Sequence, residues 1–197
     1  MWNSPNRLDE SFVVPDGAKR WDYLILACKY LEINPRRIVE IGVNKGRCIE
    51  AMARKMPDVE EFFAIDPYVA DMRYLEHGHA PGHMCRHPDQ DYFDMCYERA
   101  KKLLSRHEKI KLLRMTSLEA SQEIKGNVDV VFIDGDHSFE GTKLDITTWM
   151  MKLSPHGLIA GHDFDYIDHV RDAVIHFFGD GNFHRLCGPG DCWGYSS

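Results

Sequence analysis

Short apolar runs alternate with longer amphipathic segments along most of the chain. The apolar runs predict strands at 37–41, 62–66, 110–115, 128–133 and 158–161, followed by two short strands at 183–186 and 192–195. Apolar residues at helical spacing predict helices at 18–33, 46–56, 91–106, 118–124, 139–153 and 168–178. Ser154–Gly157 is predicted to be a turn. Strands that alternate with helices in this way indicate a parallel sheet with helices on both faces.

The end of the chain is expected to depart from the parallel pattern. Only the short turn Gly188–Asp191 separates the last two predicted strands, so these two should pair antiparallel. No long linker divides the 197 residues, which suffice for one core. We therefore expect a single domain over residues 1–197, with an N-terminal segment and helix at 1–36 and a His-rich, lid-like insertion at 67–90. Its fold class should be α/β: a three-layer sandwich around a mostly parallel seven-stranded sheet with an antiparallel C-terminal strand.

Charge and composition narrow the classes of partner. The chain has 24 Lys and Arg against 31 Asp and Glu, a net charge of −7. This balance argues against nonspecific binding of nucleic acid or of an anionic membrane, since both need a positive field. No apolar run approaches the roughly 20 residues of a membrane span, and Met1–Pro5 does not resemble a signal peptide. A cytoplasmic location is the expectation.

The six cysteines predict reduced thiols. They are scattered and include no C-x-x-C pair, and Cys28 and Cys48 fall inside predicted helices. This pattern is typical of a cytoplasmic protein and not of a disulfide framework. Cys187 and Cys192 are the one pair that could bridge, across the C-terminal turn.

The first segment that carries chemistry is Glu40–Gly46, with the spacing E-x-G-x-x-x-G between a predicted strand and a predicted helix. Its glycines allow a sharp turn and let a ligand approach the free N–H groups of the helix start. Asn44 stands where a dinucleotide-binding loop has its second glycine, which argues against a nicotinamide dehydrogenase. Glu40 suits a cationic ligand group, such as the ammonium of an amino acid. A simple turn is the alternative for these glycines.

Asp66 ends the next predicted strand and is a candidate for binding a sugar. A carboxylate at this place in an α/β fold can accept both hydroxyls of a ribose. A turn or capping role before Pro67 is the alternative. Strand order would place Asp66 at the same sheet edge as the glycine segment, so the two together predict a nucleoside site.

A third group of side chains has the composition of a divalent metal site. Asp134 ends the most apolar predicted strand, and His162 and Asp163 end the neighbouring one, so that their side chains can converge. Two carboxylates favour Mg²⁺, whereas a histidine shifts the preference toward Mn²⁺, Fe²⁺ or Zn²⁺. A structural role for His162 is the alternative.

These segments together resemble a known enzyme family. Glu40–Gly46, Asp66, Ile133–Ser138 and Gly161–Phe164 are similar to the class I S-adenosylmethionine-dependent methyltransferases. The IDGDHS and GHDF segments are the specific part, and they resemble metal-dependent small-molecule O-methyltransferases, such as the cephalosporin and sugar enzymes, and more distantly catechol O-methyltransferase. The resemblance runs from residue 37 to Trp193 and implies a Rossmann-like fold.

The resemblance also implies which residues bind S-adenosylmethionine. Those at the methionine end would be Glu40, Gly42 and Gly46, while Asp66 would hold the ribose and Asp134 would also contact the cofactor. Ser117, in preference to Thr116, would bind adenine, and its alternative is to cap the following helix.

For catalysis the resemblance implies O-methylation assisted by a divalent metal, with Mg²⁺ or Mn²⁺ held by Asp134 and Asp163. The third ligand would be His162, which stands where the relatives usually have an acid or an amide. His137 stands three residues after Asp134, where catechol-type relatives have a lysine that acts as general base. An imidazole, with its ordinary pKa of about 6.5, suits that role. Asp136 would orient His137 or, with Ser138, cap the next helix. Acceptors with adjacent oxygens, such as a sugar diol, a catechol or a related natural product, fit such a site.

Other functions stay open from the sequence. Asp136–His137 and His162–Asp163 superficially suggest a metal-dependent hydrolase, although that class places such pairs on helices of an all-α fold. A non-catalytic module that binds the cofactor or a nucleoside is a second alternative, and an N- or C-methyltransferase is a third.

Two further segments permit only broad expectations. Four histidines and Cys85 lie between His77 and His87 and suggest a substrate lid, with a solvated loop or a metal site as alternatives. Trp2, Phe12 and Val13 have no evident place in the sheet, which is compatible with a homo-oligomer.

Overall fold

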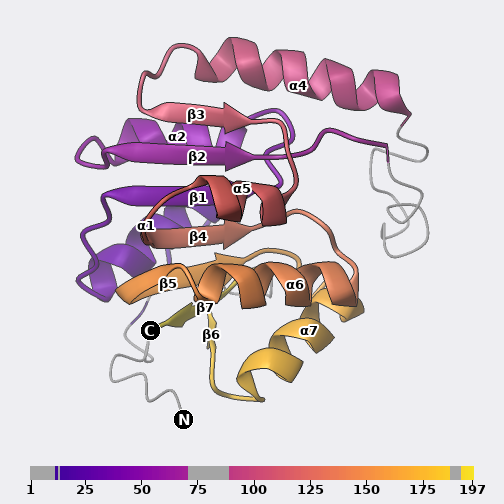
Figure 1. Cartoon of the computed structure of the whole chain (residues 1–197). Coiled ribbons are helices and arrows are strands. Elements are labelled where there is room, and N and C mark those ends of the chain that lie inside the picture. Colours follow the sequence, from indigo (N-terminus) through magenta and orange to yellow (C-terminus); the bar gives the residue numbers. More distant parts are fainter. Residues whose placement is uncertain (1–11, 13, 71–88, 187–191) are drawn as a thin grey trace.

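A computed structural model describes residues 12, 14–70, 89–186 and 192–197 (Figure 1). The helices are α1 (Arg20–Tyr30), α2 (Arg47–Lys55), α4 (Gln90–Leu104), α5 (Ser117–Glu123), α6 (Phe139–Met150) and α7 (Asp168–Phe178). The strands are β1 (Arg37–Ile41), β2 (Glu61–Ile65), β3 (Ile110–Leu113), β4 (Val128–Ile133), β5 (Leu153–Gly161), β6 (His184–Arg185) and β7 (Trp193–Ser196). Trp2, Val13, Cys187 and the residues from His77 to His87 lie outside the described residues.

The seven strands form one sheet in the order β3-β2-β1-β4-β5-β7-β6. Strands β1 to β5 pair in parallel with their neighbours, whereas β7 runs antiparallel to both β5 and β6. This sheet confirms the predicted fold class, including the antiparallel end. In Figure 1 the arrows of β1 to β4 point the same way, so their carboxyl ends share one edge of the sheet.

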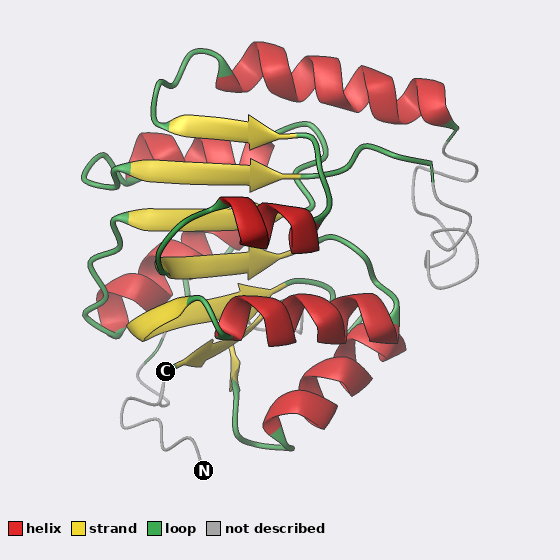
Figure 2. Ribbon diagram, in the orientation of Figure 1, coloured by secondary structure: helices red, strands yellow, loops and turns green. Residues whose placement is uncertain are grey.

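Helices cover both faces of the sheet, as Figure 2 shows. Successive side chains of a strand point to opposite faces, so each apolar run contributes to two cores. Ile38 and Phe62 pack on the side of α1, α2 and α4. Val39 and Phe63, the next residue in each strand, pack on the side of α5, α6 and α7. The near-continuous apolar runs of the sequence therefore have a direct explanation in the three-layer arrangement.

The prediction that Ser154–Gly157 is a turn was wrong, because these residues belong to β5, which runs from Leu153 to Gly161. The pairing with β4 is nevertheless interrupted there: Val128 pairs with Leu153, and the next pair is Val130 with Leu158. His156 has a φ of 63°, in the left-handed region. Pro155 and Gly157 thus mark a bulge inside a strand, which is where such residues are tolerated in sheets.

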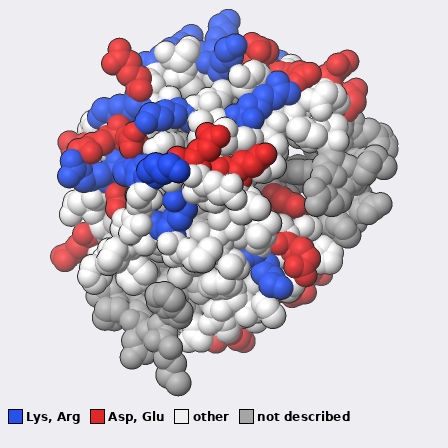
Figure 3. Space-filling model, viewed as in Figure 1, with Lys and Arg blue, Asp and Glu red and all other residues white. Residues whose placement is uncertain are grey.

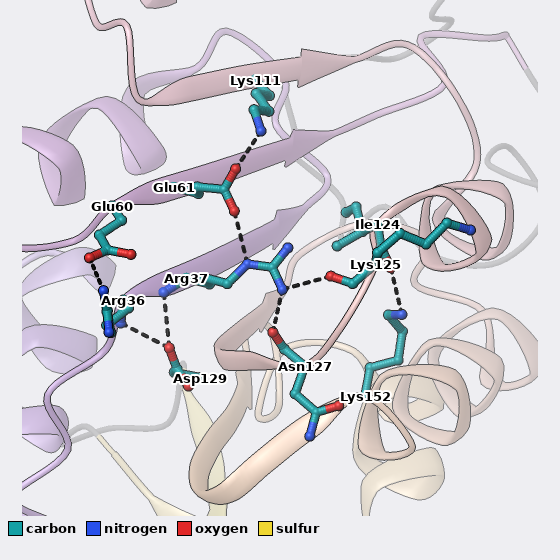
Figure 4. A network of polar contacts seen from close by, with 10 residues as sticks. All are labelled: Arg36, Arg37, Glu60, Glu61, Lys111, Ile124, Lys125, Asn127, Asp129 and Lys152. Atoms are coloured by element: carbon teal, nitrogen blue, oxygen red, sulfur yellow. Dashed lines mark hydrogen bonds and ion pairs between the residues drawn. The ribbon is translucent and has the colours of Figure 1, made fainter.

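The amino ends of the strands are joined by a network of polar contacts (Figure 4). Arg37 Nη1 donates to the carbonyl oxygens of Lys125 and Asn127 at 2.8 and 2.6 Å. The Asp129 carboxylate accepts the backbone N–H groups of Arg36 and Arg37. On the face in Figure 3, the Lys and Arg side chains over this end are interleaved with Asp and Glu. The charges on this face are therefore largely paired with one another.

Four of the cysteines and Phe12 of the N-terminal segment can be located in the described structure. Cys28, Cys48, Cys96 and Cys192 are buried free thiols. Phe12 packs edge-to-face against Tyr30 of α1, with ring centroids 5.6 Å apart, so this part of the N-terminal segment lies against the domain. Among the described residues, no helix combines the length and the apolar character needed to cross a membrane.

Candidate functional site

The chemistry-bearing residues gather at the carboxyl edge of the sheet, where open α/β folds bind ligands. Glu40 lies in β1, Asp66 follows β2 and Asp134 follows β4. Three more candidates follow the remaining parallel strands, namely Ser117 after β3 and His162 with Asp163 after β5. The sequence predicted that these residues end or follow neighbouring parallel strands, and the observed strand order puts them at one edge of the sheet.

Gly42 begins the glycine segment and lies against the backbone of Asp134. Its φ is 85°, and a Cβ at this position would lie 2.1 Å from the carbonyl oxygen of Asp134. Gly46, with a φ of 79°, is the N-cap of α2. Both glycines are therefore required by backbone conformation, and Gly42 also by the close approach of β1 to the end of β4.

The Asp66 carboxylate already has three backbone partners. Oδ2 accepts the N–H groups of Val43 and Asn44, each at 3.0 Å, and Oδ1 accepts that of Tyr68 at 2.8 Å. Burial raises its pKa, although these three hydrogen bonds act in the opposite direction. A carboxylate has about four lone-pair positions, so about one remains for a ligand. Asp66 fixes the glycine segment as well as facing the site, and it fits one ribose hydroxyl better than two.

Glu40 is a buried acid directly beneath this segment. It is 1% exposed, and its Oε2 accepts the N–H of Ile49 in the first turn of α2 at 3.0 Å. Burial raises its pKa to about 8, against the opposing effect of a hydrogen bond with Cys48. A nearby cation would stabilise the ionised form of such a buried carboxyl, which is why Glu40 suits an ammonium group.

A cavity of about 670 Å³ opens beside the glycine segment. It is lined by Gly42, Asp66, Thr116 and Ser117, which were considered for a nucleoside site, whereas Glu40, Gly46 and Asp134 are not among its lining residues. Most of its other walls are apolar, and they include Ile41, Ile65, Pro67, Phe93, Leu118, Phe139 and Leu144. A mostly apolar cleft with a few polar groups is typical of a small-molecule or cofactor site.

The cap of α5 is Thr116 and not Ser117, which corrects the alternative considered for Ser117. Thr116 accepts the N–H of Glu119, and the Glu119 carboxylate accepts the N–H of Thr116 at 2.9 Å. Ser117 instead accepts the indole N–H of Trp149 at 2.8 Å.

Asp145, a residue that sequence reasoning missed, shares the wall of the cavity with Ser117. It is 6% exposed, and its pKa is raised to about 7 by burial, against a hydrogen bond with Ser117. The one sequence signal for Asp145 was that it falls on the face of the predicted helix that is buried in the structure. Ser117 thus binds two α6 side chains in the described structure, and its hydroxyl has little capacity left for a ligand.

The second group of candidates forms a compact cluster of acids and imidazoles. His162 Nδ1 lies 3.0 Å from Asp163 Oδ1 and 3.6 Å from Asp134 Oδ1. His137 Nε2 lies 3.1 Å from Asp163 Oδ2. Asp163 has a φ of 60°, and such backbone strain in a non-glycine residue is frequent at functional sites.

Charge pairing inside this cluster determines the protonation of its members. Burial by itself raises the pKa of Asp163, but hydrogen bonds from His137 and His162 outweigh it and hold that pKa below its ordinary range. Burial lowers the pKa of His137, yet pairing with Asp163 raises it overall. Asp163 is thus ionised, and its carboxylate lies within ion-pair distance of the His137 ring.

Asp136 lies at the start of α6. Its Oδ1 accepts the N–H of Ser138 at 2.8 Å, and Ser138 is the N-cap of α6. Of the two roles considered for Asp136, the structure supports the one at the helix start. Asp163, which the sequence suggested only as a metal ligand, is an acid that lies within ion-pair distance of His137.

Arg20 is the other residue that sequence reasoning missed. It begins α1, and its Nη1 donates to Asp134 Oδ2 in an ion pair. The helix dipole disfavours a cation in the first turn of a helix. An arginine at that position was therefore the sequence signal that could have pointed to a nearby acid. Helix α1 precedes β1, and the ion pair with Asp134 places the guanidinium of its first residue at the carboxyl edge.

Asp134, His162 and Asp163 fit a divalent metal. One ligand atom from each lies within 4.8 Å of the others, and all three are at least partly buried. Two carboxylates and one imidazole are ligands that Mn²⁺ and related ions accept. The Arg20 guanidinium occupies Asp134 Oδ2, so one of the three ligands already has a cationic partner.

Known proteins resemble this chain at the level of family and fold. A family described as "Methyltransferase domain" matches residues 39–164, which span β1 to the end of the GHDF segment. A curated relative, the uncharacterized protein y4gI of Sinorhizobium fredii, is 28% identical over 141 residues. That match covers 70% of this chain but only 14% of the relative, so the chain corresponds to a small part of that protein.

Solved structures share the fold at low identity. A putative caffeoyl-CoA O-methyltransferase from Staphylococcus aureus has a TM-score of 0.62 at 15% identity, over 93% of this chain and 86% of that one. SMU.1697c, a putative methyltransferase from Streptococcus mutans in complex with SAH, has a TM-score of 0.61 at 11% identity, over 91% and 98%. SAH-bound PaMTH1 from Podospora anserina has 0.59 at 14%, over 90% and 78%. At such identities these likenesses establish the fold alone.

Proposed function

Since the chain belongs to the methyltransferase-domain family, we propose that it transfers a methyl group from S-adenosylmethionine to a hydroxyl oxygen of a small molecule. The observation that supports this proposal is that the cavity and the acid and imidazole cluster lie next to each other at the carboxyl edge. Gly135 and Asp136 line the nucleoside-sized cavity and directly follow Asp134 of the acid and imidazole cluster. A bound nucleoside would therefore lie beside groups that can hold an acceptor.

The cavity supports the orientation of the methyl donor. The apolar walls around Leu118 and Leu144 suit adenine, and Asp66 offers an acceptor position to the ribose. The amino-acid end would then reach the glycine segment, above the buried Glu40. S-adenosylmethionine supplies an electrophilic methyl group on a sulfonium, so the protein has mainly to align it and provide a nucleophile.

His137 is the residue we assign as general base. When the acceptor oxygen bonds to the methyl carbon, the carbon–sulfur bond breaks and the hydroxyl proton must leave. His137 is held by Asp163 at 3.1 Å, which stabilises the imidazolium that forms when it takes that proton. Leaving the electron pair of the broken bond on sulfur gives a neutral thioether, and the methylated oxygen is uncharged.

Asp134, His162 and Asp163 are the ligands we assign to a divalent ion such as Mg²⁺ or Mn²⁺. When bound, such an ion lowers the pKa of a coordinated hydroxyl. Two adjacent oxygens on the acceptor, as in a sugar diol or a catechol, would be oriented by the same cluster. The acceptor class is therefore proposed to be a vicinal diol.

The test is a methyl-transfer assay with S-adenosylmethionine and a panel of catechols and sugar diols, each with Mg²⁺, Mn²⁺ or EDTA. We expect S-adenosylhomocysteine to form only when an acceptor is present. His137→Gln should lower the rate about 100-fold or more at saturating substrates while binding of S-adenosylmethionine is kept. His107→Gln is the matched control, because His107 contacts Glu50 away from the site. No turnover with any acceptor, or an active His137→Gln variant, would contradict the proposal.

A further inference from the structure

Arg20 is a cation that contacts the cluster of Asp134, His162 and Asp163, which we assign as ligands of a metal cation. Its Nη1 bonds Asp134 Oδ2, while Oδ1 of the same carboxylate faces His162. The Asp134 side chain is 14% exposed and that of Arg20 is 35% exposed. The guanidinium thus lies at the boundary between the buried cluster and solvent.

The position of Arg20 at the start of α1 is unfavourable for a cation, and its ion pair with Asp134 offsets that cost. The first turn of α1 carries the positive end of the helix dipole, and the N-cap of α1 is a second cation, Lys19. The one acidic residue of that turn, Asp22, bonds the Lys19 backbone and the Lys55 ammonium. Arg20 is thus held at this end of α1 by Asp134.

A guanidinium keeps its charge at all pH values at which proteins are folded. Burial lowers the pKa of Arg20, but Asp134 together with other neighbouring groups, among them Asp163, outweighs it and raises that pKa overall. The positive charge can therefore leave Asp134 only if the side chain moves. A divalent ion bound by Asp134, His162 and Asp163 would lie next to this charge and be repelled by it.

We propose that Arg20 is an internal cation that competes with the divalent metal ion for Asp134. In the metal-free protein the guanidinium neutralises Asp134 and preserves the geometry of the cluster. Metal binding then requires Arg20 to release Asp134, and its partial exposure leaves it room to turn toward solvent. This inference rests on the metal ligands assigned above, but it does not depend on methyl transfer.

The experiment is a calorimetric titration with MnCl₂ alone, without cofactor or acceptor. We expect Arg20→Gln to bind Mn²⁺ at least 10-fold more tightly than the wild type. Arg20→Lys keeps the charge and should bind it about as the wild type does. Arg36→Gln removes the same charge from an arginine that pairs with Glu60 at the opposite edge of the sheet, and it should also match the wild type.

Equal or weaker Mn²⁺ binding by Arg20→Gln would overturn the proposal, because Arg20 would then support the ligands and not compete with the metal. Absence of Mn²⁺ binding in every variant would overturn it as well. A second measurement on the wild type covers the case in which Arg20→Gln fails to fold. The ¹⁵N-Hε resonance of Arg20 should shift as Mg²⁺ is added, and an unchanged resonance at a saturating Mg²⁺ concentration would contradict the competition. Methyl transfer can fail without affecting either result.

Discussion

At the scale of single residues, Gly42 is constrained in two ways that can be separated. It has a φ of 85°, and a Cβ would meet the Asp134 carbonyl oxygen at 2.1 Å. Gly181 has a similar φ of 76°, but a Cβ there has no atom within 4 Å. Gly181→Ala should cost about 1 kcal/mol of unfolding free energy, from conformation alone. Gly42→Ala should cost about 3 kcal/mol or more, because the end of β4 must also shift.

Urea denaturation of the two glycine variants checks this prediction. A similar loss of unfolding free energy in both variants would show that the end of β1 does not pack closely against the backbone of Asp134. The sequence predicted that Gly42 opens the ligand loop, but it gave no sign of the contact with Asp134, because that contact joins residues far apart in the chain.

Asp145 provides a residue-scale prediction about pH. Its pKa rises from the ordinary value of 3.8 to about 7 in the folded protein, chiefly because of burial. Between these two values the folded state binds the proton more tightly than the unfolded state, so this residue makes the protein less stable as pH rises. Asp145→Asn removes that effect, and its stability relative to the wild type should therefore improve between pH 5 and pH 8 by more than about 1 kcal/mol.

The measurement is the free energy of unfolding of wild type and Asp145→Asn at both pH values. Asp16→Asn, at an exposed position, serves as the control and should show a nearly constant difference from the wild type. A difference for Asp145→Asn that stays constant between the two pH values is the outcome that contradicts burial of an ionisable carboxyl in the cavity wall.

At the scale of elements, the capping box of α5 includes Thr116, a residue that lines the cavity. Thr116→Ala removes the acceptor for the Glu119 N–H and should cost about 1 kcal/mol. Thr147→Ala is the control, since this exposed threonine of α6 only donates to the carbonyl oxygen of Lys143 and should change stability by less than about 0.5 kcal/mol. Urea denaturation distinguishes the two, and an equal effect would mean that the cap contributes nothing.

Most elements could be predicted from the sequence because the apolar runs of an α/β fold are separated by clear stop signals. The boundary at Ser154–Gly157 could not, since Pro155 and Gly157 indicate an interruption but not whether the chain leaves the sheet. Pairing with β4 on both sides of the bulge keeps these residues within β5. Likewise, Thr116 and Ser117 both fit an N-cap in sequence, and only the hydrogen bonds between Thr116 and Glu119 decide between them.

At the scale of the whole molecule, parallel strand order made the site predictable. Residues that end neighbouring parallel strands meet at one edge, so Asp66, Asp134 and Asp163 could be placed together without a structure. Arg20 could not, because its position depends on how α1 packs behind the sheet. The partner of His137 was likewise missed, since Asp163 joins it only through the pairing of β4 with β5.

The central claim is that the cavity binds S-adenosylmethionine, and calorimetric titration with this compound tests it most directly. Leu144 lines the cavity and is 49% exposed, so Leu144→Arg should obstruct it without disturbing the core. Met151→Arg makes a similar change at a 77% exposed residue that caps the far end of α6. We predict micromolar binding by the wild type and by Met151→Arg, and a loss of at least 10-fold in Leu144→Arg. No binding by the wild type, or equal binding by Leu144→Arg, would contradict the account.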